Sequence, residues 1–109
     1  MKESEIEGRL RDGVKRLGGK AFKFVSPGNA GVPDRLVVLP GGKIIFAELK
    51  TDTGKVSTIQ SYQIRSLQQL GADVWVVRGL DGVRAFLEHC RQEVNQSEVC
   101  TTQLPEIRH

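Results

Sequence analysis

The stretch GVPDRLVVLPGGKIIFAELK, residues 31–50, carries the strongest structural signal in the chain. It contains two apolar runs, residues 34–39 and 43–50, separated by Pro40-Gly41-Gly42. A glycine-rich turn between two such runs predicts a β-hairpin. Asp34 opens the first run, and Glu48 and Lys50 close the second, although charged side chains are costly to bury unless something pairs with them. These charges therefore either pair with one another or hold a ligand.

The length of the turn decides which face of the hairpin carries Asp34. Side chains alternate along a strand, so Glu48 and Lys50 share a face. A two-residue loop would set Asp34 opposite Leu49, whereas a three-residue loop or a bulge would set it opposite Glu48. Three-residue loops need a left-handed residue at their end, and Gly42 supplies one. In that register the two carboxylates lie about 5 Å apart.

Two carboxylates at this separation repel each other, and a divalent cation between them removes the conflict. An oxygen ligand set without histidine or cysteine suits Mg²⁺ or Mn²⁺ better than zinc. Such an ion suits chemistry at phosphate, and Lys50 could orient a water molecule or stabilise a phosphate oxygen. The alternative is an ordinary ion-pair network of Asp34, Glu48, Lys50 and Arg35 at a strand end. The spacing alone leaves both interpretations open.

The remaining segments predict a single α/β domain. Apolar periodicity and turn residues indicate helices over residues 3–17 and 57–70, strands over 21–25 and 74–77, and a last helix capped by Asp81. Both runs of the hairpin are apolar on each side, which is typical of central strands in a sheet covered on both faces. The strand at 74–77 must cross over through a helix, which favours a parallel contact. We expect residues 1–91 to form the domain and residues 92–109 a flexible polar tail.

The bulk composition places few limits on function. The chain has 109 residues, a net charge of +3 and a pI of about 9.1, which permits contact with a polyanion without requiring it. Six basic residues could border a phosphate-binding cleft: Lys20, Lys23, Lys43, Lys55, Arg65 and Arg78. Two histidines and two cysteines without a Cys-x-x-Cys pair do not indicate zinc. The N-terminus lacks a signal-peptide apolar region, so we expect a soluble, cytoplasmic protein.

Pro33-Asp34 followed by Glu48-Leu49-Lys50 resembles the signature of the PD-(D/E)xK nucleases. The whole run of residues 31–50, with VSTIQ at 56–60 and LGADVWVVRG at 70–79, resembles the VRR-NUC family of that superfamily. The likeness extends from about Glu3 to Leu87. It implies a restriction-endonuclease-like α-β-β-β-α-β core, in which helices flank a mixed sheet.

The same resemblance implies a nuclease that depends on Mg²⁺ or Mn²⁺ and leaves a 5′-phosphate. Small stand-alone members resemble phage or prophage proteins that cut branched DNA, such as four-way (Holliday) junctions, as homodimers. We therefore expect DNA as a partner, a second copy of the chain, and the cytoplasm of a bacterium or phage-infected host. The alternative is a non-catalytic DNA-binding or assembly subunit that retains the fold.

Carried over by position, Asp34 and Glu48 resemble the metal-binding carboxylates of the family. The Leu49 carbonyl completes such sites, and Lys50 matches the catalytic lysine. The family also has a glutamate on its first helix. Glu3 is our choice because it shares a helical stripe with Ile6 and Leu10, whereas Glu5 and Glu7 are rivals.

Gln60 matches a glutamine that follows the Glu-x-Lys strand in the family. Ser57-x-x-Gln60 is also a capping box, in which the glutamine side chain bonds back to the serine backbone. Its role in the active site and its role as a cap both stay open. Trp75 is interpreted as a core residue, and His89 as structural or exposed.

Overall fold

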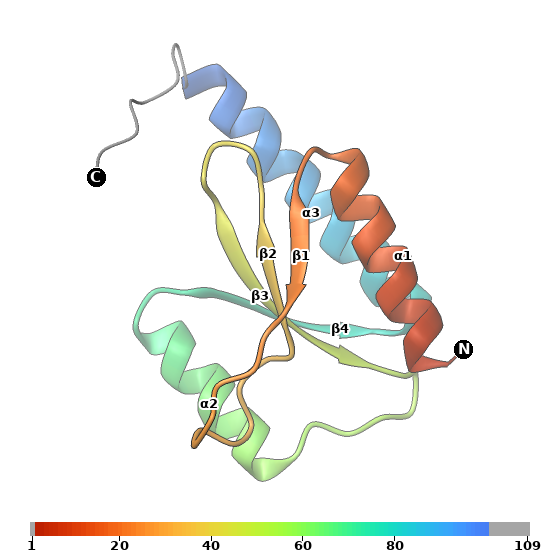
Figure 1. The fold of residues 1–109 in the computed structure, drawn as a ribbon, viewed down its shortest axis with the longest axis vertical. Helices are drawn as coiled ribbons and strands as arrows, with labels where there is room; N and C mark the ends of the chain where they lie inside the picture. Colours follow the sequence, from red (N-terminus) through yellow and green to blue (C-terminus); the bar gives the residue numbers. More distant parts are fainter. Residues whose placement is uncertain (1, 101–109) are drawn as a thin grey trace.

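The computed structural model describes residues 2–100 as an α/β fold built on one mixed sheet (Figure 1). The strands lie in the order β1-β2-β3-β4; β1, β2 and β3 are antiparallel neighbours, and β4 is parallel to β3. This arrangement confirms the predicted order of elements and the mixed sheet. The elements are α1 (Glu3–Arg16), β1 (Lys20–Lys23), β2 (Arg35–Val38), β3 (Ile44–Lys50), α2 (Thr58–Gln69), β4 (Asp73–Arg78) and α3 (Gly79–Cys100).

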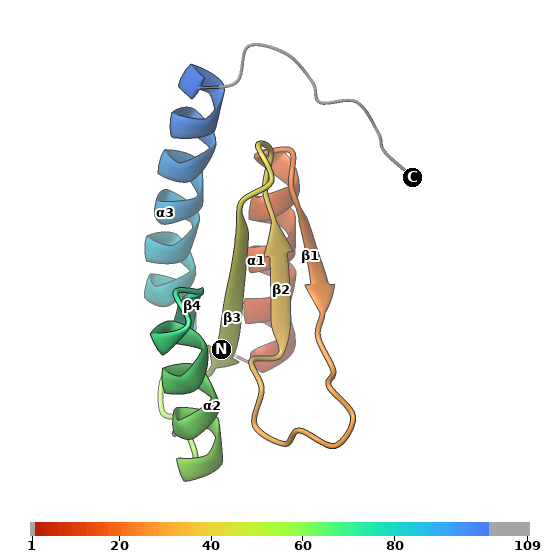
Figure 2. The same cartoon turned by 90° about the vertical axis from the view of Figure 1, so that its left-hand side faces the viewer.

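Helices α1 and α3 pack against each other and cover one face of the sheet (Figure 2). Every fourth residue of α1 is fully buried, namely Ile6, Leu10 and Val14. They join Phe86 and Cys90 of α3 and the inward side chains of the strands in one core. Burial raises the pKa of the Cys90 thiol to about 12, so this cysteine packs as a small apolar side chain.

The other face of the sheet is covered only in part, which corrects the expectation of a sheet buried on both sides. Helix α2 packs on β4 and buries Ile64, but it is too short to extend over the whole sheet. Phe22 of β1 and Ile44 of β3 are therefore 48% and 49% exposed. Between them lie the half-buried side chains of Leu36, Val38 and Phe46. We call these five residues the open apolar face.

Helix α3 differs from the sequence prediction at both ends. It begins at Gly79, directly after β4, so Asp81 lies in its first turn and does not cap it. It also continues past Arg91 to Cys100, because Val94 follows Cys90 at a spacing of four residues and is buried in the core. The predicted tail is thus helical as far as Cys100, and its last nine residues lie outside the described part. No described helix is both long and apolar enough to cross a membrane.

Candidate active site

The turn between β2 and β3 places Asp34 directly across from Glu48. The strands pair Arg35 with Ala47, and the same register extended by one residue pairs Asp34 with Glu48. The Leu39 and Gly42 N–H groups donate to the Lys43 and Leu39 carbonyls at 2.8 and 3.0 Å, which closes a three-residue loop. Gly41 and Gly42 have φ angles of 91° and 84°, which glycine adopts without steric cost. The structure therefore has the register that a three-residue loop predicts.

Four side chains meet at the end of the open apolar face. Asp34 Oδ1 accepts a hydrogen bond from the Leu49 N–H at 3.2 Å, which holds it against β3. Glu48 is only 4% exposed, and its Oε2 accepts a hydrogen bond from Gln60 Nε2 at 3.2 Å. The Lys50 ammonium lies 3.4 Å from the same oxygen. Two acids, one base and one amide donor thus share a single site.

The site carries more negative charge than its own residues compensate. Burial raises the pKa of Glu48, and the charge of Asp34 raises it further, against a smaller opposing effect of Lys50. Burial also raises the pKa of Asp34, although the Leu49 N–H and Arg35 act in the opposite direction. Ionisation of either carboxyl group is therefore less favourable in the metal-free fold than in the unfolded chain. Paired oxygen ligands of this kind fit a hard divalent cation such as Mg²⁺ or Mn²⁺.

We expect Asp34→Asn to stabilise the metal-free protein at neutral pH. A carboxyl group whose pKa is raised in the fold contributes its full stabilisation at pH values below its ordinary pKa. This stabilisation is lost as the pH rises through the raised pKa. Asparagine can still accept from the Leu49 N–H but never ionises. In EDTA, thermal melts should place the variant above the wild type at pH 7, with the difference shrinking below about pH 4. A variant that melts earlier at pH 7 would contradict this account.

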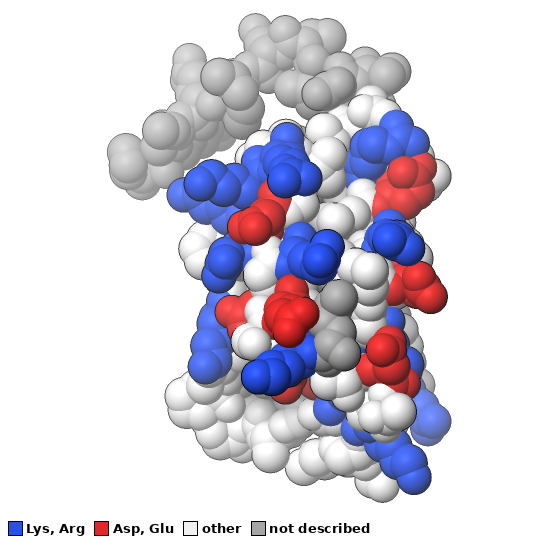
Figure 3. Space-filling view, turned by 90° about the vertical axis from the view of Figure 1, so that its right-hand side faces the viewer, with Lys and Arg blue, Asp and Glu red and all other residues white. Residues whose placement is uncertain are grey.

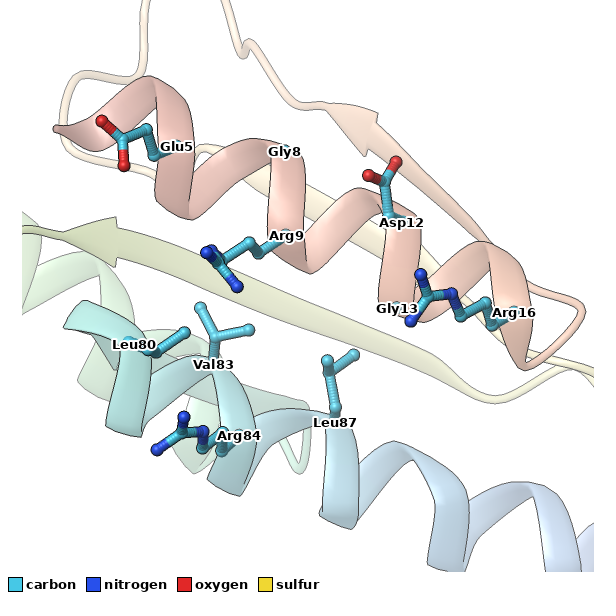
Figure 4. A pocket seen from close by; sticks show the side chains of 10 residues that line it. All are labelled: Glu5, Gly8, Arg9, Asp12, Gly13, Arg16, Leu80, Val83, Arg84 and Leu87. Atoms are coloured by element: carbon cyan, nitrogen blue, oxygen red, sulfur yellow. The ribbon is translucent and has the colours of Figure 1, made fainter. Parts of the chain in front are cut away.

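The structure separates the three glutamates at the start of α1. Glu3 lies close enough to Asp34 for its charge to raise the pKa of that carboxyl. Glu7 Oε2 instead contacts Arg35 Nη2 at 2.6 Å. Glu5 lines a groove of about 570 Å³ between α1 and α3 (Figure 4), and neither Asp34 nor Glu48 lines this groove. Of the three, Glu3 is the one whose charge acts directly on Asp34.

Gln60 has both of the roles that its position suggests. Its side-chain oxygen accepts from the Ser57 N–H at 2.9 Å, and its backbone N–H donates to Ser57 Oγ at 3.2 Å. This capping box uses the amide oxygen and leaves Nε2 free to donate to Glu48. The cap therefore fixes which end of the amide faces the carboxylate. Its contribution to catalysis stays a prediction.

The ion-pair network considered from the sequence is divided between the two sides of the sheet. Arg35 is buried, bonds through Nη1 to the Asp34 carbonyl at 2.8 Å, and pairs with Glu7 of α1. Only Lys50 pairs with Glu48. Among the described residues, the Asp34 carboxylate has no ion-pair partner. A self-contained salt bridge thus accounts for Glu48 but not for Asp34.

The predicted basic border is only partly assembled. Arg78 donates to the Gly54 carbonyl and lies, with the exposed Lys55, near the loop that follows Lys50. Lys43 instead lies 3.7 Å from Asp73 Oδ2. On the face shown in Figure 3, basic and acidic side chains are interspersed. That face offers a polyanion no continuous basic surface.

One group of polar residues was missed in the sequence. Asp73, His89 and Glu93 come together between β4 and α3, although His89 was interpreted as a lone structural histidine. The spacing of four between His89 and Glu93 was a usable signal, because such residues share a helix face. Asp73 could not be added without the packing of α3 on β4.

Comparisons with known proteins identify the family of this chain. No protein-family model matches the chain. Over 81 residues it is 47% identical to "Putative nuclease p44" of Acyrthosiphon pisum secondary endosymbiont phage 1, covering 74% of this chain and 87% of the relative. A solved structure named "VRR_NUC domain" superposes with a TM-score of 0.75 at 32% identity, covering 80% of this chain and 95% of that one. The chain belongs to the VRR-NUC family.

A second solved structure, named "VRR_NUC domain protein", has a TM-score of 0.63 at 21% identity and covers 84% of this chain and 89% of its own. At that identity it supports the fold alone. The family predicted from Asp34, Glu48 and Lys50 is thus confirmed, as is the α/β fold with its mixed sheet. The roles of the individual VRR-NUC site residues stay predictions.

Proposed function

We propose that this VRR-NUC protein is a Mg²⁺- or Mn²⁺-dependent endonuclease that hydrolyses phosphodiester bonds in DNA, with a preference for branched substrates such as four-way junctions. The observation that carries the proposal is the pairing of Asp34 with Glu48 across β2 and β3, with Lys50 beside them. The family and the name of the phage relative support nuclease activity in general. The metal and the branched substrate rest on the site chemistry and on the resemblance.

Each residue has a distinct part in this proposal. Asp34 and Glu48, with the Leu49 carbonyl, would hold the ion, and Glu3 would add negative charge at the entrance. A bound Mg²⁺ or Mn²⁺ would supply Lewis acidity to the phosphate and to a water molecule.

Two further side chains would act beside the carboxylates. Gln60 holds Glu48 Oε2 in place from α2. Lys50 presents an ammonium that can orient the attacking water or donate a hydrogen bond to a phosphate oxygen as negative charge develops there.

A cleavage assay with structured substrates tests this function. Purified protein is incubated with labelled linear, flap and four-way-junction DNA, in Mg²⁺, in Mn²⁺ and in EDTA. We expect metal-dependent cutting, fastest on the branched substrates, and 5′-phosphate ends that ligase can reseal. Binding to the same DNA without cutting in any metal would instead indicate a non-catalytic DNA-binding subunit.

We also propose a homodimer formed through the open apolar face. A chain of 12.1 kDa has little surface with which to hold a junction, and a second copy doubles it. Exposed Phe22 and Ile44 border the face, and Phe22 also lines a hollow of about 320 Å³ beside Val38 and Pro40. Contiguous exposed apolar surface of this kind is typical of association sites.

Light scattering at micromolar concentration should therefore give twice the monomer mass. Ile44→Lys should shift the mass toward the monomer, because a charge would be buried in the interface. Tyr62→Lys, at an exposed position on α2, is the matched control and should leave the dimer intact. A wild-type monomer with DNA bound would refute the dimer.

A further inference from the structure

A compact polar cluster joins the start of β4 to the middle of α3. His89 Nε2 lies 2.7 Å from Asp73 Oδ2 and 3.9 Å from Glu93 Oε1. One ligand atom from each residue lies within 4.8 Å of the other two. The three side chains are 22–23% exposed, so the cluster is largely buried and still reachable from solvent.

Trp75 holds two of these side chains in place. Its indole Nε1 donates to Asp73 Oδ1 at 3.1 Å, which leaves Oδ2 directed at His89. Its ring stacks on the imidazole with centroids 4.8 Å apart and an interplanar angle of 26°. The other side of Trp75 packs edge-on against Phe86 in the core. Carboxylate and imidazole orientations fixed by neighbours in this way are typical of metal ligands.

The cluster is separate from the candidate active site. Asp73 pairs with Ile45, three residues before Glu48 on β3, which corresponds to about 10 Å along the strand. Asp73 and Trp75 also point toward α3, whereas Glu48 points to the opposite face, toward Gln60 of α2. The two groups therefore lie on different faces of the sheet and share no residue.

We propose that Asp73, His89 and Glu93 bind a divalent transition-metal ion such as Zn²⁺. One imidazole nitrogen and two carboxylate oxygens are ligands that zinc and its neighbours accept, whereas Mg²⁺ prefers oxygen alone. Because its ligands come from both β4 and α3, the ion would stabilise the packing of the helix on the sheet. Three protein ligands leave a further position for water.

The positive charge of Lys43 disfavours binding of the metal ion. Its ammonium lies 3.7 Å from Asp73 Oδ2, the oxygen assigned to the metal, and supplies a competing positive charge. Lys43 is part-exposed and directly precedes β3, the strand that pairs with β4, so its side chain can turn into solvent. Removing this charge should tighten metal binding, an effect opposite in direction to the loss of a ligand.

The test uses the full chain without an affinity tag, in an Asp34→Asn/Glu48→Gln background that disables the other site. Metal-free protein is titrated with ZnCl₂ by calorimetry and with Co²⁺ by visible absorption. We expect one equivalent of Zn²⁺, a rise in melting temperature on binding, and a Co²⁺ spectrum characteristic of low coordination number. Mg²⁺ should give neither calorimetric binding nor a rise in melting temperature.

Three further variants decide the assignment. His89→Gln, which can still hydrogen-bond to Asp73, and Glu93→Gln, which keeps the size of the side chain, should each weaken Zn²⁺ binding at least tenfold. Lys43→Met should strengthen it. Unchanged affinity in both folded glutamine variants, or no Zn²⁺ bound by the background protein, would overturn the proposal and leave an ion pair between Asp73 and His89.

Discussion

Asp34→Asn should abolish Mg²⁺ binding and with it DNA cleavage. The variant keeps the shape of the side chain and its bond from the Leu49 N–H, but it removes one of the two facing carboxylates. We expect cleavage to fall about 10³-fold or more, because the ion supplies several kcal/mol of charge stabilisation and about 1.4 kcal/mol corresponds to a factor of ten. Calorimetric titration with Mg²⁺ and single-turnover cleavage on a four-way junction measure the two effects.

The melting temperature of the same variant makes the result decisive. The metal-free variant is expected to be at least as stable as the wild type at neutral pH, so lost cleavage cannot be attributed to unfolding. Asp12→Asn removes the same charge from an exposed position on α1 and should leave Mg²⁺ affinity and cleavage unchanged. If Asp34→Asn binds Mg²⁺ as the wild type does, the metal assignment is wrong.

Lys50→Ala separates the chemical step from folding and binding. The lysine side chain is only 17% exposed, and its stem lies along the loop that contains Gly54, so some packing is lost with the charge. We still expect a stability change within about 1 kcal/mol, since the charge is paired but lies outside the core. Cleavage should fall by about 10² or more, the scale of losing one positioned acid–base or electrostatic group. Mg²⁺ binding should survive.

Two further variants separate the loss of the lysine charge from the loss of its packing. Lys50→Met keeps the apolar stem, so its stability should be closer to that of the wild type while its cleavage falls as far as in Lys50→Ala. Lys50→Arg keeps the charge and tests whether a planar guanidinium can replace the compact ammonium. DNA affinity, measured in parallel, should weaken only slightly, because one phosphate contact among several is lost. A folded Lys50→Ala protein that cuts at the wild-type rate would refute the proposed mechanism.

The sequence was most informative where a local conformational rule determines which distant residues lie together. Gly41 and Gly42 allow a three-residue turn, the turn sets the register, and the register brings Asp34 to Glu48. Gln60 shows the limit of such reasoning. The family resemblance assigned it to the active site and a local capping rule assigned it to Ser57, and only the structure shows that the two ends of one amide reach both Ser57 and Glu48.

Features that depend on how helices lie on the sheet could not be predicted. Apolar runs in β2 and β3 indicate burial on both faces, but they do not say that α2 covers only the part near β4. Among the described side chains after Cys90, Val94 is the one that joins the core, and one apolar residue is too little to predict a helix face. Asp73 and His89 are sixteen residues apart and meet only because α3 folds back over β4.

The three-residue turn has a consequence for how VRR-NUC sequences of this type can vary over time. The turn begins six residues after Asp34, about 20 Å along the strand, and touches none of the site. Losing or gaining one residue there would rotate Asp34 to the far side of the sheet unless a bulge absorbed the change. Many substitutions at Pro40 should be tolerated, whereas a single-codon deletion should act as a loss-of-function allele in a protein that still folds. Pro40 is thus free to vary, whereas the length of the turn and its two left-handed glycines are constrained.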